Sequence, residues 1–222
     1  MRPKHLAIQL SKLQPHPCLH VELEQYATEG DLAAYWTLAI DQIDGISNRV
    51  VADLGSGNGV LGIGCLLMGA SHVIFVESDA SAVGVIQTNL SSHPEFHGRW
   101  TVHQAHVGRD PIPLEDASLI VMNPPWGAQV PKADRPFFDL ALESQVDVIH
   151  VLHHERAGHL SGLIRDAGWE SEHLLRTEFR LPAQYAHHAK RKAFTDVLCW
   201  RIHRSGDARL PQDDDDESNK GG

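Results

Sequence analysis

Short apolar runs rich in β-branched residues alternate along the chain with stretches in which apolar residues recur at helical spacing. The pattern predicts strands near 50–54, 73–76, 100–104, 117–122, 146–152, 173–179 and 194–203, and helices near 4–13, 31–43, 60–68, 80–90, 135–144 and 156–167. This alternation favours a mainly parallel sheet with helices on both faces, an α/β Rossmann-like fold, because each parallel crossover needs a returning helix. The last two strands predict an antiparallel hairpin at the sheet edge.

Chain length and charge together indicate one domain with an acidic end. At 222 residues the chain suits a single α/β domain, which we place at 1–203, with a helical N-terminal part over 1–45. The net charge of −10 owes half its size to the acidic run at 213–217. Because no apolar residue follows Leu210, we expect 204–222 to be an acidic, disordered tail.

The segment 180–195 has the opposite charge character. It holds several basic residues and two histidines without one acidic residue. A local basic face can coexist with an acidic total, and nucleic-acid phosphates are one partner for such a face. An ordinary solvated strand edge is the other interpretation. The residues that would contact RNA here are Tyr185, His188, Lys190, Arg191 and Lys192.

Membrane insertion and secretion find no support in the sequence. No uninterrupted apolar run approaches the roughly 20 residues that a membrane span needs. The N-terminus lacks the apolar segment and cleavage pattern of a signal peptide. Cys18, Cys65 and Cys199 lie far apart, which is typical of reduced packing thiols. These features predict a cytoplasmic protein.

A glycine-rich turn follows the first predicted strand. Residues 53–59 read Asp-Leu-Gly-Ser-Gly-Asn-Gly, and a helix is predicted directly behind them. Glycines at 55, 57 and 59 let the backbone approach a ligand closely, while the helix N-terminus favours electron-rich groups. A nucleoside cofactor fits such a turn.

The glycine turn alone does not identify the cofactor. Gly57, Gly59 and Gly62 also satisfy the G-x-G-x-x-G spacing of dinucleotide enzymes. Glu77, at the end of the second predicted strand, is the expected partner of ribose hydroxyls in both classes. Asp53, just before the glycines, suits the amino-acid end of a sulfonium cofactor, and so favours S-adenosylmethionine.

A second motif, Asn123-Pro124-Pro125-Trp126, follows an apolar strand and should lie at the carboxyl edge of the sheet, beside the glycine turn. The Asn123 side-chain oxygen and the Pro124 carbonyl can accept both N–H bonds of a planar amine. This would free the nitrogen lone pair, which is otherwise delocalised. Trp126 offers a ring face for stacking a flat base or amide. In-line methyl displacement would then depend mainly on positioning, without an obligatory general base.

With both motifs, the sequence resembles the class I S-adenosylmethionine-dependent methyltransferases, and within them the archaeal and eukaryotic small-subunit ribosomal RNA adenine-N6 methyltransferases. The resemblance runs over most of residues 4–203. Four segments carry it: Leu23-Glu24-Gln25-Tyr26-Ala27-Thr28, 50–61, 122–127, and Leu181-Pro182-Ala183-Gln184-Tyr185 with the basic cluster that follows.

The resemblance implies that the chain methylates adenine N6 in small-subunit ribosomal RNA. It also implies a fold with a seven-stranded sheet whose last strand is reversed. The catalytic residues would be Asn123, Pro124, Pro125 and Trp126. The S-adenosylmethionine site would comprise Gln25, Tyr26, Thr28, Asp53, Gly55, Gly57, Gly59, Leu61, Glu77, Ser78, His106 and Asn123. Among these, Gln25, Tyr26 and Thr28 would form a flap over cofactor and substrate. The resemblance also implies a small zinc-containing activator subunit as a candidate partner.

Two positions depart from the family pattern. Trp126 stands where relatives commonly have phenylalanine, a conservative aromatic change. His106 stands where many relatives place an aspartate that holds the cofactor adenine amine. A histidine ring nitrogen can keep such a hydrogen bond, or the contact is lost.

The histidines do not predict a metal site, although the chain has 16 of them. His154 and His159 are five residues apart, whereas a zincin needs two histidines one helical turn apart. The N-Pro-Pro-aromatic motif leaves other functions open. One alternative is a protein glutamine-N5 methyltransferase, because an amide nitrogen also has a delocalised lone pair. Guanine-N2 methylation of RNA is a second alternative. A non-catalytic cofactor-binding module that retains the fold is a third. A dinucleotide oxidoreductase has no use for this motif.

Overall fold

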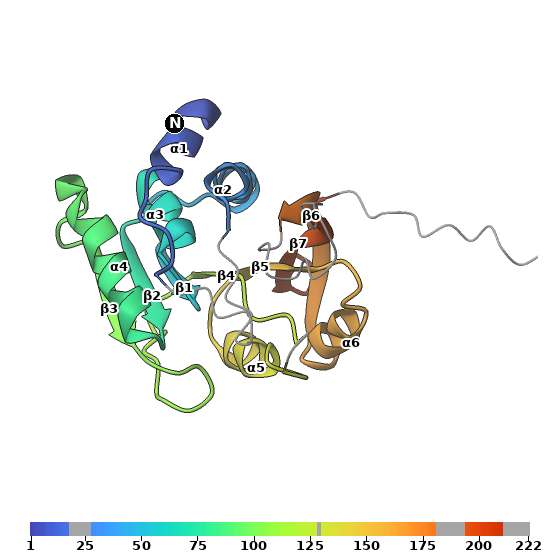
Figure 1. The fold of residues 1–222 in the computed structure, drawn as a ribbon. Coiled ribbons are helices and arrows are strands. Elements are labelled where there is room, and N and C mark those ends of the chain that lie inside the picture. The colour runs from blue at the N-terminus through green and yellow to red at the C-terminus, as the bar shows by residue number, and fades with distance from the viewer. Residues whose placement is uncertain (18–27, 128–129, 181–193, 211–222) are drawn as a thin grey trace, which may run out of the picture.

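The computed structural model describes residues 1–17, 28–127, 130–180 and 194–210. Its strands are β1 Val50–Leu54, β2 His72–Glu77, β3 Trp100–Gln104, β4 Leu119–Met122, β5 Val148–His154, β6 Trp169–Arg180 and β7 Phe194–Arg204. They form one seven-stranded sheet in the order β3-β2-β1-β4-β5-β7-β6 (Figure 1). The first five strands in this order run parallel to one another, while β7 is antiparallel to both β5 and β6.

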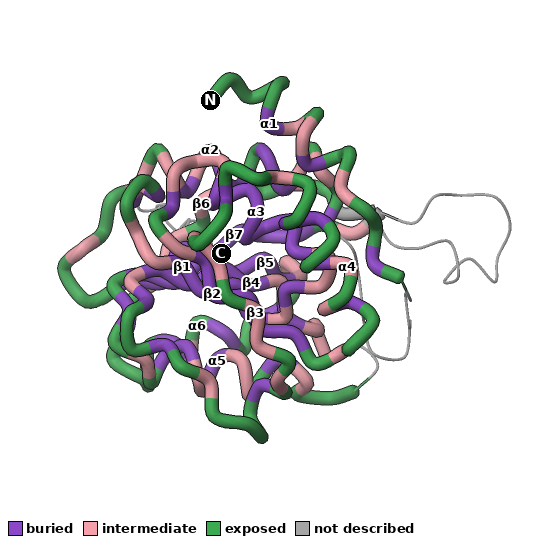
Figure 2. The backbone as a smooth tube through the Cα atoms, turned by 90° about the vertical axis from the view of Figure 1, so that its left-hand side faces the viewer, coloured by how far each residue is buried: buried purple, intermediate pink, exposed green. Residues whose placement is uncertain are grey.

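Helices cover both faces of this sheet. They are α1 Pro3–Leu10, α2 Gly30–Asp44, α3 Val60–Leu67, α4 Ala80–Ser91, α5 Arg135–Glu143 and α6 His159–Asp166, with a 3-10 turn at Pro94–Phe96. One apolar core joins α1, α2, α3 and α4 to one face of the sheet, and a second core joins α5 and α6 to the other. The buried strands run between these layers (Figure 2).

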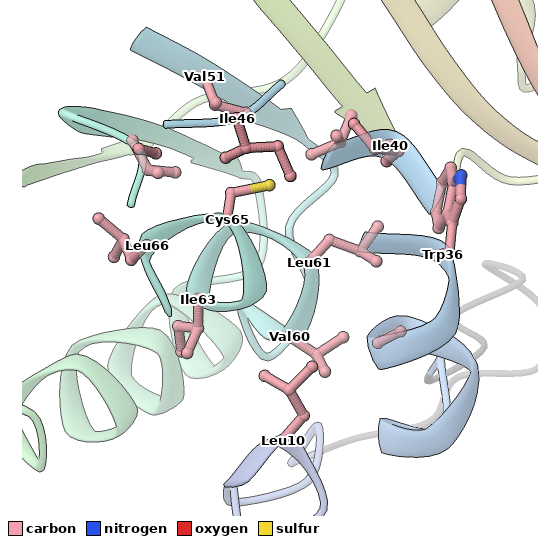
Figure 3. Packing of buried hydrophobic residues seen from close by; sticks show 14 of the residues in the cluster. Leu10, Trp36, Ile40, Ile46, Val51, Val60, Leu61, Ile63, Cys65 and Leu66 are labelled. Atoms are coloured by element: carbon pink, nitrogen blue, oxygen red, sulfur yellow. The ribbon is translucent and has the colours of Figure 1, made fainter. Parts of the chain in front are cut away.

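Alternation along the strands produces the two cores. Successive strand residues point to opposite faces, so Val51 enters the first core and Ala52 the second. On the first face α3 packs between the sheet and the N-terminal helices, with Leu61 facing α2 and Val60 facing Leu10 (Figure 3). Both faces of the central strands are apolar because both are covered.

The predicted fold class is confirmed. The sheet is mainly parallel, helices cover both faces, and the last strand in the chain is the reversed one. This strand, β7, lies between β5 and β6, so the terminal hairpin ends the sheet with β6 as its outer strand. None of the described helices is long and apolar enough to cross a membrane.

Some element boundaries differ from the predicted ones. The first helix ends at Leu10 because the chain turns at Ser11, where a Cβ on Gly30 would stand 2.5 Å from the Ser11 hydroxyl oxygen. The second helix begins at Gly30, one residue before the predicted start, and the lack of a Cβ there lets the two segments approach closely. The last helix begins at His159, later than predicted, because pairing with β7 extends β5 to His154.

A buried ionic cluster joins the C-terminal end of α2 to the last strands. Arg201 is fully buried on β7, and its Nη2 lies 2.8 Å from both Asp44 and Asp207, while its Nη1 lies 3.0 Å from Glu172. His150 Nε2 lies 2.8 Å from the second oxygen of Asp44. Burial alone would raise the pKa of Asp44, but hydrogen bonds from His150 and Arg201 hold it below its usual range.

The same cluster corrects the predicted extent of the tail. Arg209 Nη1 lies 3.2 Å from Asp44, and the Arg209 backbone N–H donates to Glu172 at 2.8 Å. The prediction of a disordered end over 204–222 is therefore wrong for 204–210, which packs against buried charge. Residues 211–222 lie outside the described part of the chain.

We predict that Asp44→Ala lowers the free energy of unfolding by about 3–5 kcal/mol, because it leaves the buried Arg201 without its best-shielded partner. Asp207→Ala is the matched control, since Asp207 binds the same guanidinium but its side chain is 44% exposed. It should cost about 1 kcal/mol or less. Urea denaturation monitored by circular dichroism measures both. Equal losses would show that Asp44 stabilises the cluster no more than the exposed Asp207 does.

Candidate functional site

The glycine turn links the end of β1 to the start of α3 with backbone angles that favour glycine. Gly55, Gly57 and Gly59 have φ angles of 70°, 57° and 84°. The backbone N–H groups of Gly55 and Ser56 donate to the Val76 carbonyl at 2.9 and 3.0 Å. A Cβ on Gly55 would also stand 3.1 Å from the Phe137 ring. The turn is thus fixed against β2 and packs closely against Phe137 of α5.

Asp53 lies beneath this turn as a buried carboxylate. Its Oδ2 accepts the Gly62 backbone N–H at 2.8 Å, and its Oδ1 has no hydrogen-bond partner among the described residues. Burial raises the pKa of Asp53 to about 7, the nearby Glu77 carboxylate acts in the same direction, and the Gly62 bond opposes both. An unpaired buried carboxylate oxygen at a ligand-binding turn is suited to a cationic group.

Glu77, at the end of β2, is held by backbone donors. Its Oε2 accepts the Gly57 N–H at 2.9 Å, and its Oε1 accepts the N–H groups of Ser78 and Asp79 at 2.7 and 2.9 Å. These bonds fix the carboxylate at the edge of the sheet. Carboxylate lone pairs that remain can accept from two adjacent ribose hydroxyls.

A cleft of about 480 Å³ opens at this edge of the sheet. Most of the predicted site residues within the described ranges line it: Thr28, Gly55, Gly57, Leu61, Glu77, Ser78, His106, Asn123 and Pro125. Gly59, Pro124 and Trp126 lie next to lining residues in the chain, and Asp53 lies two positions before Gly55, but none of these four lines the cleft itself. Gln25, Tyr26, Tyr185, His188, Lys190, Arg191 and Lys192 lie outside the described residues.

His106 lies on the loop after β3, on the far wall of the cleft. Its Nδ1 is 2.9 Å from the Val107 carbonyl oxygen. A carbonyl only accepts, so Nδ1 donates here, and the tautomer with its proton on Nδ1 has Nε2 as an acceptor. The loop packs closely against the start of α5, since a Cβ on Gly108 would stand 2.6 Å from Pro136. The ring can therefore offer an amine the acceptor that aspartate offers elsewhere.

The N-terminal segment contributes a wall that the sequence did not predict. The Gln14 carbonyl accepts from the side-chain amides of Asn58 and Asn89 at 3.0 and 3.2 Å, and the Gln14 N–H donates to Asn89 at 2.8 Å. This double anchor places His16 at the cleft, beside Gly57. The one sequence signal that could have indicated such an anchor is the polar Asn89 within the predicted helix, at a position that the structure shows to be buried.

The start of α5 forms the opposite wall, which was also missed. Phe137, Pro136, Ala133 and Val130 line the cleft there. Asp134 fixes this segment from behind, since its Oδ2 lies 3.2 Å from His153 Nε2 and 3.1 Å from His159 Nε2. The two histidines therefore meet at one carboxylate, although within the described ranges no group of three or more such residues could hold a metal ion.

The Asn-Pro-Pro-Trp loop leaves β4 at the same edge. Asn123 is half-buried, and its side-chain Nδ2 donates to the Thr28 hydroxyl at 3.2 Å. Its Oδ1 accepts the Trp126 indole N–H at 3.1 Å. The predicted reacting residue thus shares the cleft with the glycine turn and with Thr28 of the predicted flap.

These residues fit S-adenosylmethionine. The unpaired Asp53 oxygen suits the amino-acid end, Glu77 suits the ribose, and His106 with the apolar Val107 and Leu61 suits the adenine. This assignment agrees with the order in which the parallel strands deliver these residues to one edge.

Comparison with known proteins agrees with this geometry. The family described as "Methyltransferase small domain" matches residues 36–143. A protein of uncharacterized function from Methanocaldococcus jannaschii is 32% identical, covering 93% of this chain and 96% of its own length. An rRNA N(6)-adenosine-methyltransferase from Danio rerio is 26% identical, with 79% and 86% covered. The crystal structure of a candidate RNA methyltransferase from Pyrococcus horikoshii has a TM-score of 0.81 at 36% identity, covering 92% of this chain and 98% of that one.

The raised pKa of Asp53 predicts a pH-dependent cofactor affinity. Only the ionised carboxylate attracts the α-ammonium group of the amino-acid end, so binding should weaken as the pH falls through about 7. From pH 7.5 to pH 6 the dissociation constant of S-adenosylhomocysteine should rise about eightfold. Calorimetric titration at several pH values measures this. Asp53→Asn should flatten the dependence, and an equal slope in both proteins would contradict the assignment.

Proposed function

Since the chain belongs to the class I S-adenosylmethionine-dependent methyltransferases and uses that cofactor, we propose that it methylates adenine N6 in small-subunit ribosomal RNA. The observation that carries the proposal is the position of Asn123. Its side chain emerges from β4 in the cleft that also holds Glu77 and the glycine turn. A planar amine bound there would lie between an amide acceptor and the methyl donor.

The chemistry needs little beyond positioning. S-adenosylmethionine, when bound, would supply a methyl group from its sulfonium, and the rest of the cofactor would leave as a neutral thioether. Asn123 Oδ1 and the Pro124 carbonyl accept the two N–H bonds of the amine and turn its lone pair toward the donor. Pro124 is buried and Pro125 lines the cleft, so the loop keeps this geometry. The nitrogen gives its proton to water once the new C–N bond has formed.

RNA as the substrate is supported by the relatives and by charge. Proteins named rRNA N(6)-adenosine-methyltransferase from Danio rerio and Caenorhabditis elegans match this chain along most of its length. The basic residues Lys190, Arg191 and Lys192, with Tyr185 and His188, would contact the RNA backbone. The target adenine would leave its helix to enter the cleft, as bases must when the reacting atom is an exocyclic amine.

The proposal extends to partner and compartment. The strand β3 is a free edge of the described sheet, with Trp100 and Val102 half-buried. A small zinc-containing activator subunit could cover such an edge, and we propose this edge as its position. We further propose that the enzyme acts in the cytoplasm.

Transfer of labelled methyl from S-adenosylmethionine to unmodified small-subunit ribosomal RNA, followed by nucleoside analysis, tests the proposal. We expect the label in N6-methyladenosine at one position. Label in N2-methylguanosine, or on a glutamine of an added protein instead of RNA, would replace the adenine assignment. Cofactor binding without transfer to any RNA, with the purified protein and with cell extract added to supply an activator, would favour a non-catalytic module.

Asn123→Ala should lower the turnover number by about a hundredfold or more, because the amine then loses the acceptor that frees its lone pair. Cofactor affinity should stay within about twofold of wild type, since Asp53 and Glu77 remain in place. Single-turnover kinetics and calorimetry measure the two quantities. Turnover at the wild-type rate would remove Asn123 from the reaction.

A further inference from the structure

The side chain of Asn123 is held at both ends of its carboxamide. Nδ2 lies 3.2 Å from the Thr28 hydroxyl oxygen, and Oδ1 lies 3.1 Å from Trp126 Nε1. The three residues come from the segment before α2 and from the loop after β4, which are far apart in the sequence. The contact therefore joins the predicted flap to the reacting loop.

The chemistry of Trp126 determines which way the carboxamide faces. An indole nitrogen only donates, so its partner on Asn123 must be the oxygen, and the amide nitrogen must face Thr28. Thr28 is buried, which keeps its hydroxyl as a fixed acceptor. With phenylalanine at 126, a carboxamide turned by 180° would lose no donor there.

Trp126 is itself held by neighbouring rings. Its ring centroid lies 6.3 Å from that of His153 and 6.1 Å from that of His154, the latter in an edge-on arrangement. His153 is buried and contacts Asp134 at 3.2 Å. The ring that donates to Asn123 therefore has a defined place relative to β5 and to the start of α5.

We propose that Trp126 is a positioning residue that fixes Asn123 through its indole N–H, in addition to any stacking of its ring on the substrate. The proposal rests on the proposed methylation of a planar amine in this cleft. The bond uses one lone pair of Oδ1 and leaves the second for one substrate N–H. The other substrate N–H then requires the Pro124 carbonyl, which accepts no backbone hydrogen bond from the residues that the structure describes.

The kinetic test is Trp126→Phe, which keeps an aromatic face but removes the N–H. We expect the turnover number on ribosomal RNA to fall about five- to tenfold, the scale of one neutral hydrogen bond, with KM for RNA and cofactor affinity unchanged. Trp169→Phe is the matched control, because Trp169 also donates through its indole, to the Leu142 carbonyl at 3.1 Å. It should lower the melting temperature without lowering turnover.

A wild-type turnover number in Trp126→Phe would overturn the proposal, as would an equal fall in Trp169→Phe. A loss confined to KM for RNA would also overturn it, because that pattern belongs to stacking alone. An inactive wild-type protein would instead contradict the proposed function, and the geometry can then be tested without catalysis.

Hydrogen exchange of the indole N–H groups, followed by ¹H–¹⁵N spectra, is that independent test. Asn123→Ala should speed the exchange of the Trp126 indole proton and leave that of Trp169 unchanged. The Trp126 signal is identified by its loss in Trp126→Phe. An exchange rate that Asn123→Ala does not alter would show that the bond is absent in solution, and the proposal would fail whatever the enzyme's substrate.

Discussion

Backbone hydrogen bonds hold β2, β1 and β4 parallel and in register, with Leu54 opposite Val76 on one side and Met122 on the other. Because parallel strands end at one edge, the residues that follow them must emerge there together. Glu77, the glycine turn and Asn123 are brought into one cleft by this alignment, although they are spread over about 70 positions of the chain. The rest of the structure completes that edge.

Two kinds of element complete it. Asn58 and Asn89 bind the carbonyl of Gln14 and thereby draw the N-terminal segment over the glycine turn. On the other side, Asp134 is fixed by two histidines and carries the start of α5 against the turn. Each wall depends on a buried polar group with its partners in place, which is costly to disturb. The cleft is therefore largely formed before any ligand enters it.

Local patterns predicted the strands, the helices and both motifs, because each depends on residues close in sequence. The Asp53 to Gly59 turn and the Asn123 loop could be found this way, and the alternation of strands and helices placed them at one edge. The positions of His16 and Phe137 could not, since they depend on contacts between distant segments. The same reason explains the error over residues 204–210, whose order depends on Asp44 and Glu172 far back in the chain.

The central claim is that the cleft presents a methyl donor to Asn123. A crystal structure with S-adenosylhomocysteine tests it most directly. The account predicts the ribose hydroxyls within hydrogen-bond distance of Glu77, the amino-acid end at the turn above Asp53, and the sulfur facing Asn123 Oδ1. A ligand bound elsewhere, or one whose sulfur faces away from the Asn-Pro-Pro-Trp loop, would contradict it.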